Sequence, residues 1–129
     1  MTTEVVNGIQ RGDRAASLRK IIAYANQPKK YFVDGKYSDG KGCHCAVGVL
    51  FTPAQLRDIA RRGMTQASVM ILASAVGRKN IEFVTGMSLS ELKELQEAND
   101  RLSGDRIRPA KTEIRMWAQT RLNSLEMGQ

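Results

Sequence analysis

The spacing of apolar residues along the chain predicts a protein built mainly from helices. Between positions 13 and 27, apolar residues recur three and four positions apart, as they do on one face of a helix: Leu18, Ile21, Ile22 and Ala25. Asp13 is a typical N-cap residue, and Pro28 cannot continue a helix. We therefore expect a first helix from Asp13 to about Gln27.

The middle of the chain has three further apolar stretches. Residues 43–51 are small and apolar throughout, which predicts a buried helix. Thr52-Pro53-Ala54-Gln55 has the pattern of a capping box with proline at the first helical position, and predicts a helix that ends near Gly63. Thr65 is placed to cap the next helix. Its run at 69–73 is apolar on almost every side, which predicts that this helix is the central one.

The last third of the chain predicts two consecutive helices. Residues 81–84, which precede them, fit either a short strand or an extended link. Ser88-Leu89-Ser90-Glu91 is a second capping box, and the helix that it opens is expected to stop before Gly104. Pro109 is expected to open the last helix. The apolar face of that helix comprises Ile114, Trp117, Ala118, Leu122 and Leu125.

One strand signal interrupts this helical pattern. Asp34-Gly35 is typical of a tight hairpin turn and is flanked by Tyr31-Phe32-Val33 and Lys36-Tyr37-Ser38. The length of 129 residues, 42% of them hydrophobic, fits one globular domain with its own core. The predicted fold class is mainly α, a compact bundle of five or six short helices with one small β-hairpin. In this single domain, residues 1–12 are expected to be a flexible N-terminal segment and residues 13–126 the helical core.

Charge is distributed unevenly along the chain, whose net charge is +7. Residues 1–64 have a net charge of +6 and residues 65–129 of only +1. Basic residues interleaved with aromatic ones around the expected hairpin are typical of surfaces that bind a partner or track phosphates. Lysines that keep a sheet edge soluble are the alternative explanation. The partner-binding candidates are Lys29, Lys30, Tyr31, Lys36, Tyr37 and Lys41.

The last two expected helices differ in charge. The first has the acidic residues Glu91, Glu94, Glu97 and Asp100, and the second begins with a basic stripe, Arg108, Lys111 and Arg115. Consecutive helices with a short link tend to pack antiparallel, so an intramolecular charge match is one interpretation and a nucleic-acid-binding face is the other. Arg121 and Asn99 fall on apolar faces and require partners there. We predict a structural polar cluster of Glu97, Asn99, Asp100 and Arg121.

The chain contains few residues suited to catalysis or metal binding. Cys43, His44 and Cys45 are contiguous, and neighbouring side chains cannot converge on one tetrahedral zinc ion. His44 is the only histidine, and no orienting third group accompanies it for thiol catalysis. Gly40-Lys41-Gly42 lacks the P-loop pattern. We expect no metal, no cofactor and two reduced, buried thiols. With no signal peptide or membrane span in the sequence, we expect a cytoplasmic protein.

Two short motifs resemble an uncharacterised family of small bacterial and phage proteins. The run from Cys45 to Leu50 is similar to the Cys-Ala-x-Gly-Ala-Leu motif of that family, with Val49 where the family usually has alanine. Asn99-Asp100 before the last helix is similar to a later Asn-Asp pair. The resemblance covers residues 14–125 in outline. It implies a helical fold and a phage or bacterial origin, and it implies no catalytic residues.

These observations favour a non-enzymatic interaction protein. We expect a small protein, phage-encoded if the resemblance holds, that binds and modulates or inhibits a host protein. The alternative is a nucleic-acid or nucleotide-binding protein that uses the basic first half, and a thiol-dependent enzyme ranks third. The sequence does not decide whether the protein forms a homo-oligomer. No membrane partner is expected.

Overall fold

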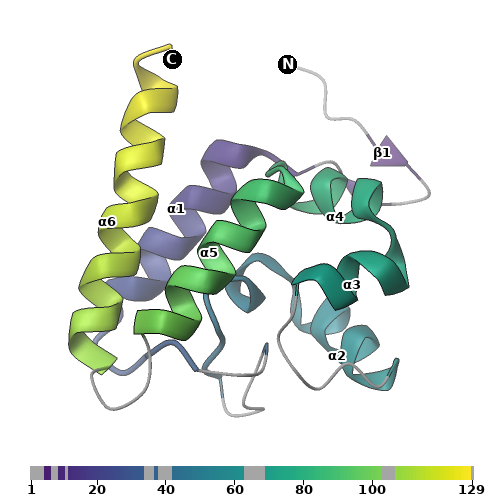
Figure 1. Ribbon diagram of the computed structural model, residues 1–129, viewed down its shortest axis with the longest axis horizontal. Coiled ribbons are helices and arrows are strands. Elements are labelled where there is room, and N and C mark those ends of the chain that lie inside the picture. Colours follow the sequence, from purple (N-terminus) through teal and green to yellow (C-terminus); the bar gives the residue numbers. More distant parts are fainter. Residues whose placement is uncertain are drawn as a thin grey trace.

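Six α-helices make up most of the chain that the structure describes. The computed structural model describes residues 5–6, 9–10, 12–33, 37, 42–62, 69–102 and 107–128, with only the backbone for 5–6, 9–10, 100–102 and 107–110. The helices are α1 (Arg14–Ala25), α2 (Pro53–Arg61), α3 (Val69–Val76), α4 (Arg78–Thr85), α5 (Leu89–Leu102) and α6 (Ile107–Glu126) (Figure 1). The described part also has a 3-10 helix, η1 (Gly48–Leu50), and an antiparallel pair, β1 (Val5–Val6) and β2 (Ile9–Gln10). The prediction of a compact, mainly helical fold is confirmed.

The centre of the fold is formed by α1, α5 and α6. α6 packs along α1 and also against α5, and α5 and α6 run in roughly opposite directions (Figure 1). All three helices contribute apolar side chains that are completely buried: Leu18 and Ile21, Leu92 and Leu95, Ile114 and Ala118. Burying one large aliphatic side chain stabilises a fold by roughly 1.5–3 kcal/mol, so these contacts hold the three helices together.

Helix starts lie where the capping signals predict them. Asp13 Oδ1 accepts a hydrogen bond from Ala15 N at 2.8 Å, so α1 begins directly after Asp13. The capping box is complete at Thr52, where the side chains of Thr52 and Gln55 each accept from the other's backbone N–H. Ser88 Oγ accepts from Glu91 N at 3.1 Å at the start of α5. The last helix begins at Ile107, two residues before Pro109, a difference within the ordinary uncertainty of a helix boundary.

The prediction that the apolar run 69–73 forms the central helix is wrong. α3 lies at the edge of the molecule beside α4, far from α6 (Figure 1). Val69 and Leu72 are buried, whereas Met70 is 51% and Ile71 53% exposed. An apolar composition alone does not bury a helix, because most of a protein's accessible surface is apolar in any case.

Residues 43–51 are mostly buried, as predicted, but they do not form the expected helix. The segment is extended at residues 43–45 and forms only the short 3-10 helix at residues 48–50. Its backbone bonds to another part of the chain, since Val33 N donates to His44 O at 3.1 Å and Cys45 N donates to Tyr37 O at 3.2 Å. These tertiary hydrogen bonds replace the local ones that a helix would need.

Residues 81–84 are helical, which corrects the expectation of a strand or an extended link. They belong to α4, which lies between two glycines with positive φ, Gly77 at 97° and Gly86 at 69°. Such backbone favours glycine because it has no Cβ. Gly86 also lies against the start of α1, where an added Cβ would be 2.5 Å from Arg14 N. The two glycines therefore end α3 and α4 sharply, and Gly86 allows α4 to pack closely against α1.

The hairpin expected around Asp34-Gly35 is not supported. Asp34, Gly35, Lys36 and Ser38 lie outside the described residues, and the described positions 31–33 and 37 form no strand. Phe32 instead forms an isolated parallel bridge with His44. The segment after α1 therefore pairs with residues 42–45. The expected pairing of residues 31–33 with residues 36–38 is not seen in the described residues.

Candidate interaction surface

Basic residues from two parts of the sequence meet at the C-terminal end of α1. Lys111 Nζ donates to the carbonyl oxygen of Gln27 at 2.6 Å, and Arg115 Nη1 donates to Asn26 Oδ1 at 3.0 Å. The first-half lysines follow directly in the chain, after Pro28. We call this region the α1-end surface, and define it by Lys29, Lys30, Tyr31, Lys111 and Arg115.

The position of these cations at the end of α1 has a simple electrostatic cause. The last carbonyl groups of a helix lack helical partners and form the negative end of its dipole, which attracts lysine and arginine. α6 runs along α1 and delivers Lys111 and Arg115 to that end. The contact fixes the register of the two helices, and it also concentrates positive charge on one face.

The charge of the α1-end surface is not neutralised by the residues around it that are described. The ion pairs of the described chain are formed by Arg14, Arg19, Arg62, Arg78 and Arg121. Within that part of the chain, none of the four cations Lys29, Lys30, Lys111 and Arg115 pairs with a carboxylate. The surface therefore has four cations that form no ion pair in the described part of the chain, with Glu113 as the acidic residue nearest to Lys111 and Arg115 along α6.

The segment with Lys29, Lys30 and Tyr31 is held firmly against the molecule. The hydroxyl group of Tyr24 in α1 donates to Tyr31 O, and His44 N donates to the same hydroxyl at 2.9 Å. Lys30 Nζ donates to Gly42 O at 2.8 Å. Tyr31 is 40% exposed, so part of this aromatic residue is open to solvent next to the two lysines in the chain.

Tyr37 is not part of this surface, which corrects the prediction that it is an exposed contact residue. Its side chain is only 4% exposed, and its ring meets that of Phe51 edge to face with centroids 6.5 Å apart. Gly48 lies directly against it, because an added Cβ would be 2.1 Å from Tyr37 O. Lys36 and Lys41 lie outside the described residues, as does the side chain of Arg108.

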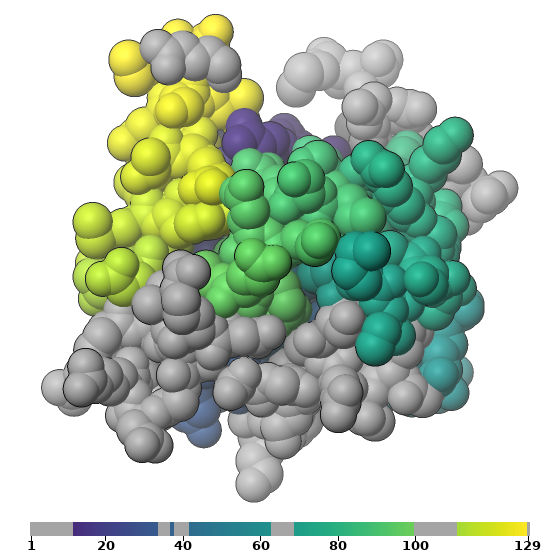
Figure 2. Space-filling model, in the orientation of Figure 1, coloured from purple at the N-terminus to yellow at the C-terminus, as the bar shows by residue number. Residues whose placement is uncertain are grey.

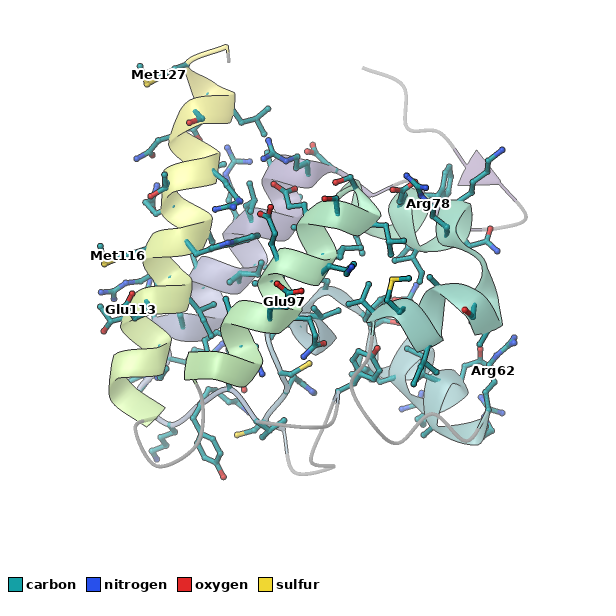
Figure 3. The ribbon with its side chains drawn as sticks, viewed as in Figure 1. Arg62, Arg78, Glu97, Glu113, Met116 and Met127 are labelled. Carbon is teal, nitrogen blue, oxygen red and sulfur yellow. The ribbon has the colours of Figure 1, made fainter. Side chains whose placement is uncertain are left out.

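The predicted cluster of Glu97, Asn99, Asp100 and Arg121 does not form as expected. Arg121 pairs with Glu94 at 2.7 Å and Glu91 at 3.4 Å, and its guanidinium carbon lies 3.7 Å from the centroid of the Trp117 ring. Glu97 points into solvent from the middle of α5 (Figure 3). The side chain of Asp100 is not described. Arg121 therefore meets the first turns of α5, because the two helices run in opposite directions.

Glu91 links three helices through a contact that no sequence signal indicates. Its carboxylate accepts from Arg14 Nε at 2.8 Å and from Arg14 Nη2 at 2.6 Å, in the two-pronged geometry typical of arginine. The hydrogen bond to Glu91 raises the pKa of Arg14. With Arg121 on its other side, Glu91 connects α1, α5 and α6. Arg14 and Glu91 are 77 positions apart, so only the fold brings them together.

Asn99 is fully buried and joins two distant segments to α5. Its Oδ1 accepts from Ala46 N at 2.8 Å, and its Nδ2 donates to Val33 O at 3.0 Å. The two sequence motifs singled out above, one at residues 45–50 and one at Asn99, are thus in direct contact. Asn99 has a structural role in this contact, because its amide satisfies backbone groups that would otherwise be buried without partners.

The cysteines and the histidine do not converge on a common point. Cys43 and Cys45 are both buried thiols, and Cys45 Sγ accepts from Gly48 N at 3.3 Å. Across the described ranges, no three side chains of histidine, cysteine, aspartate or glutamate gather as metal ligands would. That the protein holds no metal stays a prediction.

The structure also has a pocket that the sequence did not indicate. A pocket of about 510 Å³ lies between α2, α3 and α4. Its walls are mainly apolar, and the Asp58–Arg62 ion pair, with a distance of 3.1 Å, contributes to its lining.

Comparison with known proteins gives no relative. No protein-family model, no curated protein and no solved structure matches the chain. Separately, within the described ranges no helix has the length and apolar character needed to cross a membrane. Function must therefore be argued from the surfaces themselves.

Proposed function

We propose that this protein is a non-enzymatic interaction protein that binds an acidic surface of another protein through its α1-end surface. The observation that supports this most is the pair of contacts from Lys111 to Gln27 and from Arg115 to Asn26. They place cations from two parts of the chain on one face, where none of them forms an ion pair within the described part of the chain. That the partner is a host protein, which this chain modulates or inhibits, rests on the resemblance alone.

The chemistry of the surface fits a protein partner. Tyrosine and arginine are enriched at protein interfaces, where an amphipathic ring supplies contact area and a planar guanidinium binds carboxylates. Lys30 and Arg115 are already held by hydrogen bonds to Gly42 and Asn26, so less side-chain freedom is lost on binding. Complementary charge also speeds association and selects acidic partners.

A single-stranded nucleic acid is the second candidate, and one observation favours it. Tyr31 is exposed directly beside Lys29 and Lys30, and an aromatic ring among cations can stack on a base while lysines contact phosphates. Such binding would fall steeply with salt, with a slope in log–log form of about −0.7 per phosphate contact.

The test compares two double variants of equal charge change. Lys29→Glu/Arg115→Glu alters the α1-end surface, and Lys79→Glu/Lys93→Glu alters exposed lysines on α4 and α5. Each variant lowers the net charge by the same amount, so long-range electrostatics are matched. Wild type and both variants are used as bait in a bacterial lysate at physiological salt, since high salt would screen the charges. Their melting temperatures are compared by circular dichroism.

The proposal expects one specific protein to be retained by wild type and by Lys79→Glu/Lys93→Glu, and to be lost with Lys29→Glu/Arg115→Glu. Equal retention by both well-folded variants would contradict it. Tight, salt-sensitive binding of a random single-stranded oligonucleotide, measured by fluorescence anisotropy and lost only in Lys29→Glu/Arg115→Glu, would favour the second candidate instead.

A further inference from the structure

Arg115 is held to the rest of the protein by an uncharged side chain. Its Nη1 donates to the amide oxygen Oδ1 of Asn26, at 3.0 Å. An amide oxygen accepts a hydrogen bond but brings no negative charge. The arginines that form ion pairs within the described ranges have a carboxylate partner instead: Arg14, Arg19, Arg62, Arg78 and Arg121. The contact with Asn26 therefore fixes the Arg115 guanidinium against α1 without neutralising it.

The other edge of this guanidinium is open. Nε and Nη2 of an arginine point the same way and form a fork that matches the two oxygens of a carboxylate. Arg14 uses this fork, since its Nε and Nη2 donate to the two oxygens of Glu91 at 2.8 Å and 2.6 Å. In Arg115, which is exposed, neither atom has a hydrogen-bond partner among the described residues. Arg115 can thus receive an external carboxylate in the geometry of the Arg14–Glu91 pair.

The charges around Arg115 favour an anion at this fork. Lys111 lies one helical turn before it on α6, and like charges at that spacing repel each other. An anion bound beside both cations relieves this repulsion. Glu113 lies between them in the sequence, but two positions along a helix put it about 160° around the axis from each. Glu113 points to the outer side of α6, together with Met116 (Figure 3). It is therefore on the opposite side of α6 from the two cations.

Resting on the function proposed above, we infer that Arg115 recognises a carboxylate of the partner through Nε and Nη2, and that Asn26 is the positioning residue for this fork. The recognised group is the side chain of an aspartate or glutamate. α6 forms the left edge of the molecule in the space-filling view, so a partner can approach this helix from the side (Figure 2).

The uncharged nature of Asn26 is what this role requires. An aspartate at this position would pair with Arg115 and compete with the partner's carboxylate. Asn26 is also the C-cap of α1, where the negative end of the helix dipole disfavours an added anion. Since Asn26 and Arg115 are both exposed, their contact adds little to folding stability. Its loss should therefore change binding rather than the melting temperature.

The first test removes the fork and keeps the charge. Fluorescein-labelled poly-glutamate is the probe, and its binding is measured by fluorescence anisotropy at physiological salt. Arg115→Lys retains one positive charge but cannot bind a carboxylate with two parallel donors. We expect it to raise the Kd about fivefold or more. Arg57→Lys, the same change at an exposed position on α2, is the control and should bind like wild type.

The second test concerns Asn26. Asn26→Asp places an internal carboxylate on Arg115 and should raise the Kd by a similar factor, about fivefold. Asn123→Asp makes the same change about 12 Å along α6 from Arg115, beyond a Debye length of about 8 Å, and should have little effect. Asn26→Ala should weaken binding in the wild type but not in Arg115→Ala, because Asn26 acts only through the guanidinium.

Equal binding of the probe by Arg115→Lys and wild type would overturn the role of the fork, as would a probe that does not bind wild type. An equal effect of Asn26→Ala with and without Arg115 would overturn its positioning role. If Lys29→Glu/Arg115→Glu still loses binding in these cases, the function proposed above stands, and if it also binds like wild type, both fail. Tighter binding of a single-stranded oligothymidylate, lost in Arg115→Lys, would make the ligand a phosphate and overturn the inference. Circular dichroism verifies that each variant is folded.

Discussion

The amide of Asn99 lies where three segments of the chain meet. It accepts one hydrogen bond from Ala46 N and donates one to Val33 O, and no water reaches it because the residue is fully buried. An amide is suited to this position because it presents both an acceptor and a donor. Aspartate would direct a second oxygen at the carbonyl of Val33, and leucine would leave both backbone groups without partners.

Asn99→Leu should therefore destabilise the protein strongly. Each buried backbone group left without a partner costs about 1–3 kcal/mol, so we expect a loss of about 2–4 kcal/mol in the free energy of unfolding, measured with urea. Asn123→Ala, at an exposed position on α6, is the control and should change stability by less than about 0.5 kcal/mol. Equal stability of the two variants would show that the contacts of Asn99 do not hold residues 33 and 46.

Glu91 and Glu94 make a second comparison possible at the scale of single residues. Both pair with Arg121, but Glu91 also binds Arg14, and its side chain is only 13% exposed against 55% for Glu94. Glu91→Gln leaves two neighbouring arginines without their shared anion, so we expect it to lower stability by about 1–3 kcal/mol, less than for a fully buried pair. Glu94→Gln should cost about 0–1 kcal/mol. Equal melting temperatures of Glu91→Gln and Glu94→Gln would contradict this role of Glu91.

Burial of the two thiols predicts their reactivity. Cys43 and Cys45 are both buried, and Cys45 completely so. We expect both to react slowly with Ellman's reagent in the native protein and rapidly in urea, with two thiols released per chain, the number of cysteines in the sequence. Rapid labelling without denaturant would show that residues 43–45 open easily from the core.

At the scale of elements, local signals predicted helix starts well. The caps at Asp13, Thr52 and Ser88 each require only a few neighbouring residues, and all three side chains accept the predicted backbone hydrogen bond. At Ser88 the predicted capping box is seen only in part, because the Glu91 carboxylate binds Arg14 and Arg121. Long-range contacts decide the other elements. The composition of residues 43–51 predicts a helix, but their backbone bonds to Val33 and Tyr37. The apolar composition of α3 predicts a central helix, but α3 packs at the edge of the molecule. No local pattern contains the information that the centre is shared by α1, α5 and α6.

The cap of α1 provides a prediction at this scale. α1 is central, so loss of its N-cap should lower global stability rather than only fray one end. We expect Asp13→Ala to cost about 1 kcal/mol and Asp13→Ser, which keeps a capping oxygen, to cost much less. The midpoint of urea unfolding measures both. A larger loss for Asp13→Ser than for Asp13→Ala would contradict the capping role.

At the scale of the whole molecule, the sequence indicated the residues of the candidate surface but not that they lie together. Lys29, Lys30 and Tyr31 were found from their charge and aromatic pattern, and Lys111 and Arg115 from the stripe on the last helix. These two sets form one surface because α6 packs along α1. No local pattern in the sequence indicates that packing. Tyr37 was assigned wrongly, because exposure of an aromatic residue is decided by tertiary packing against Gly48 and Phe51.

The most direct test of the central claim is photo-crosslinking from single positions. A photoreactive benzoylphenylalanine replaces Tyr31 in the α1-end surface or, as the control, Met116 on the outer side of α6. Both native side chains are exposed, by 40% and 57%. After irradiation in a bacterial lysate, we expect one discrete crosslinked protein from position 31 and none from position 116. A protein crosslinked only from position 116, or none from position 31, would contradict the assignment of the α1-end surface as the contact.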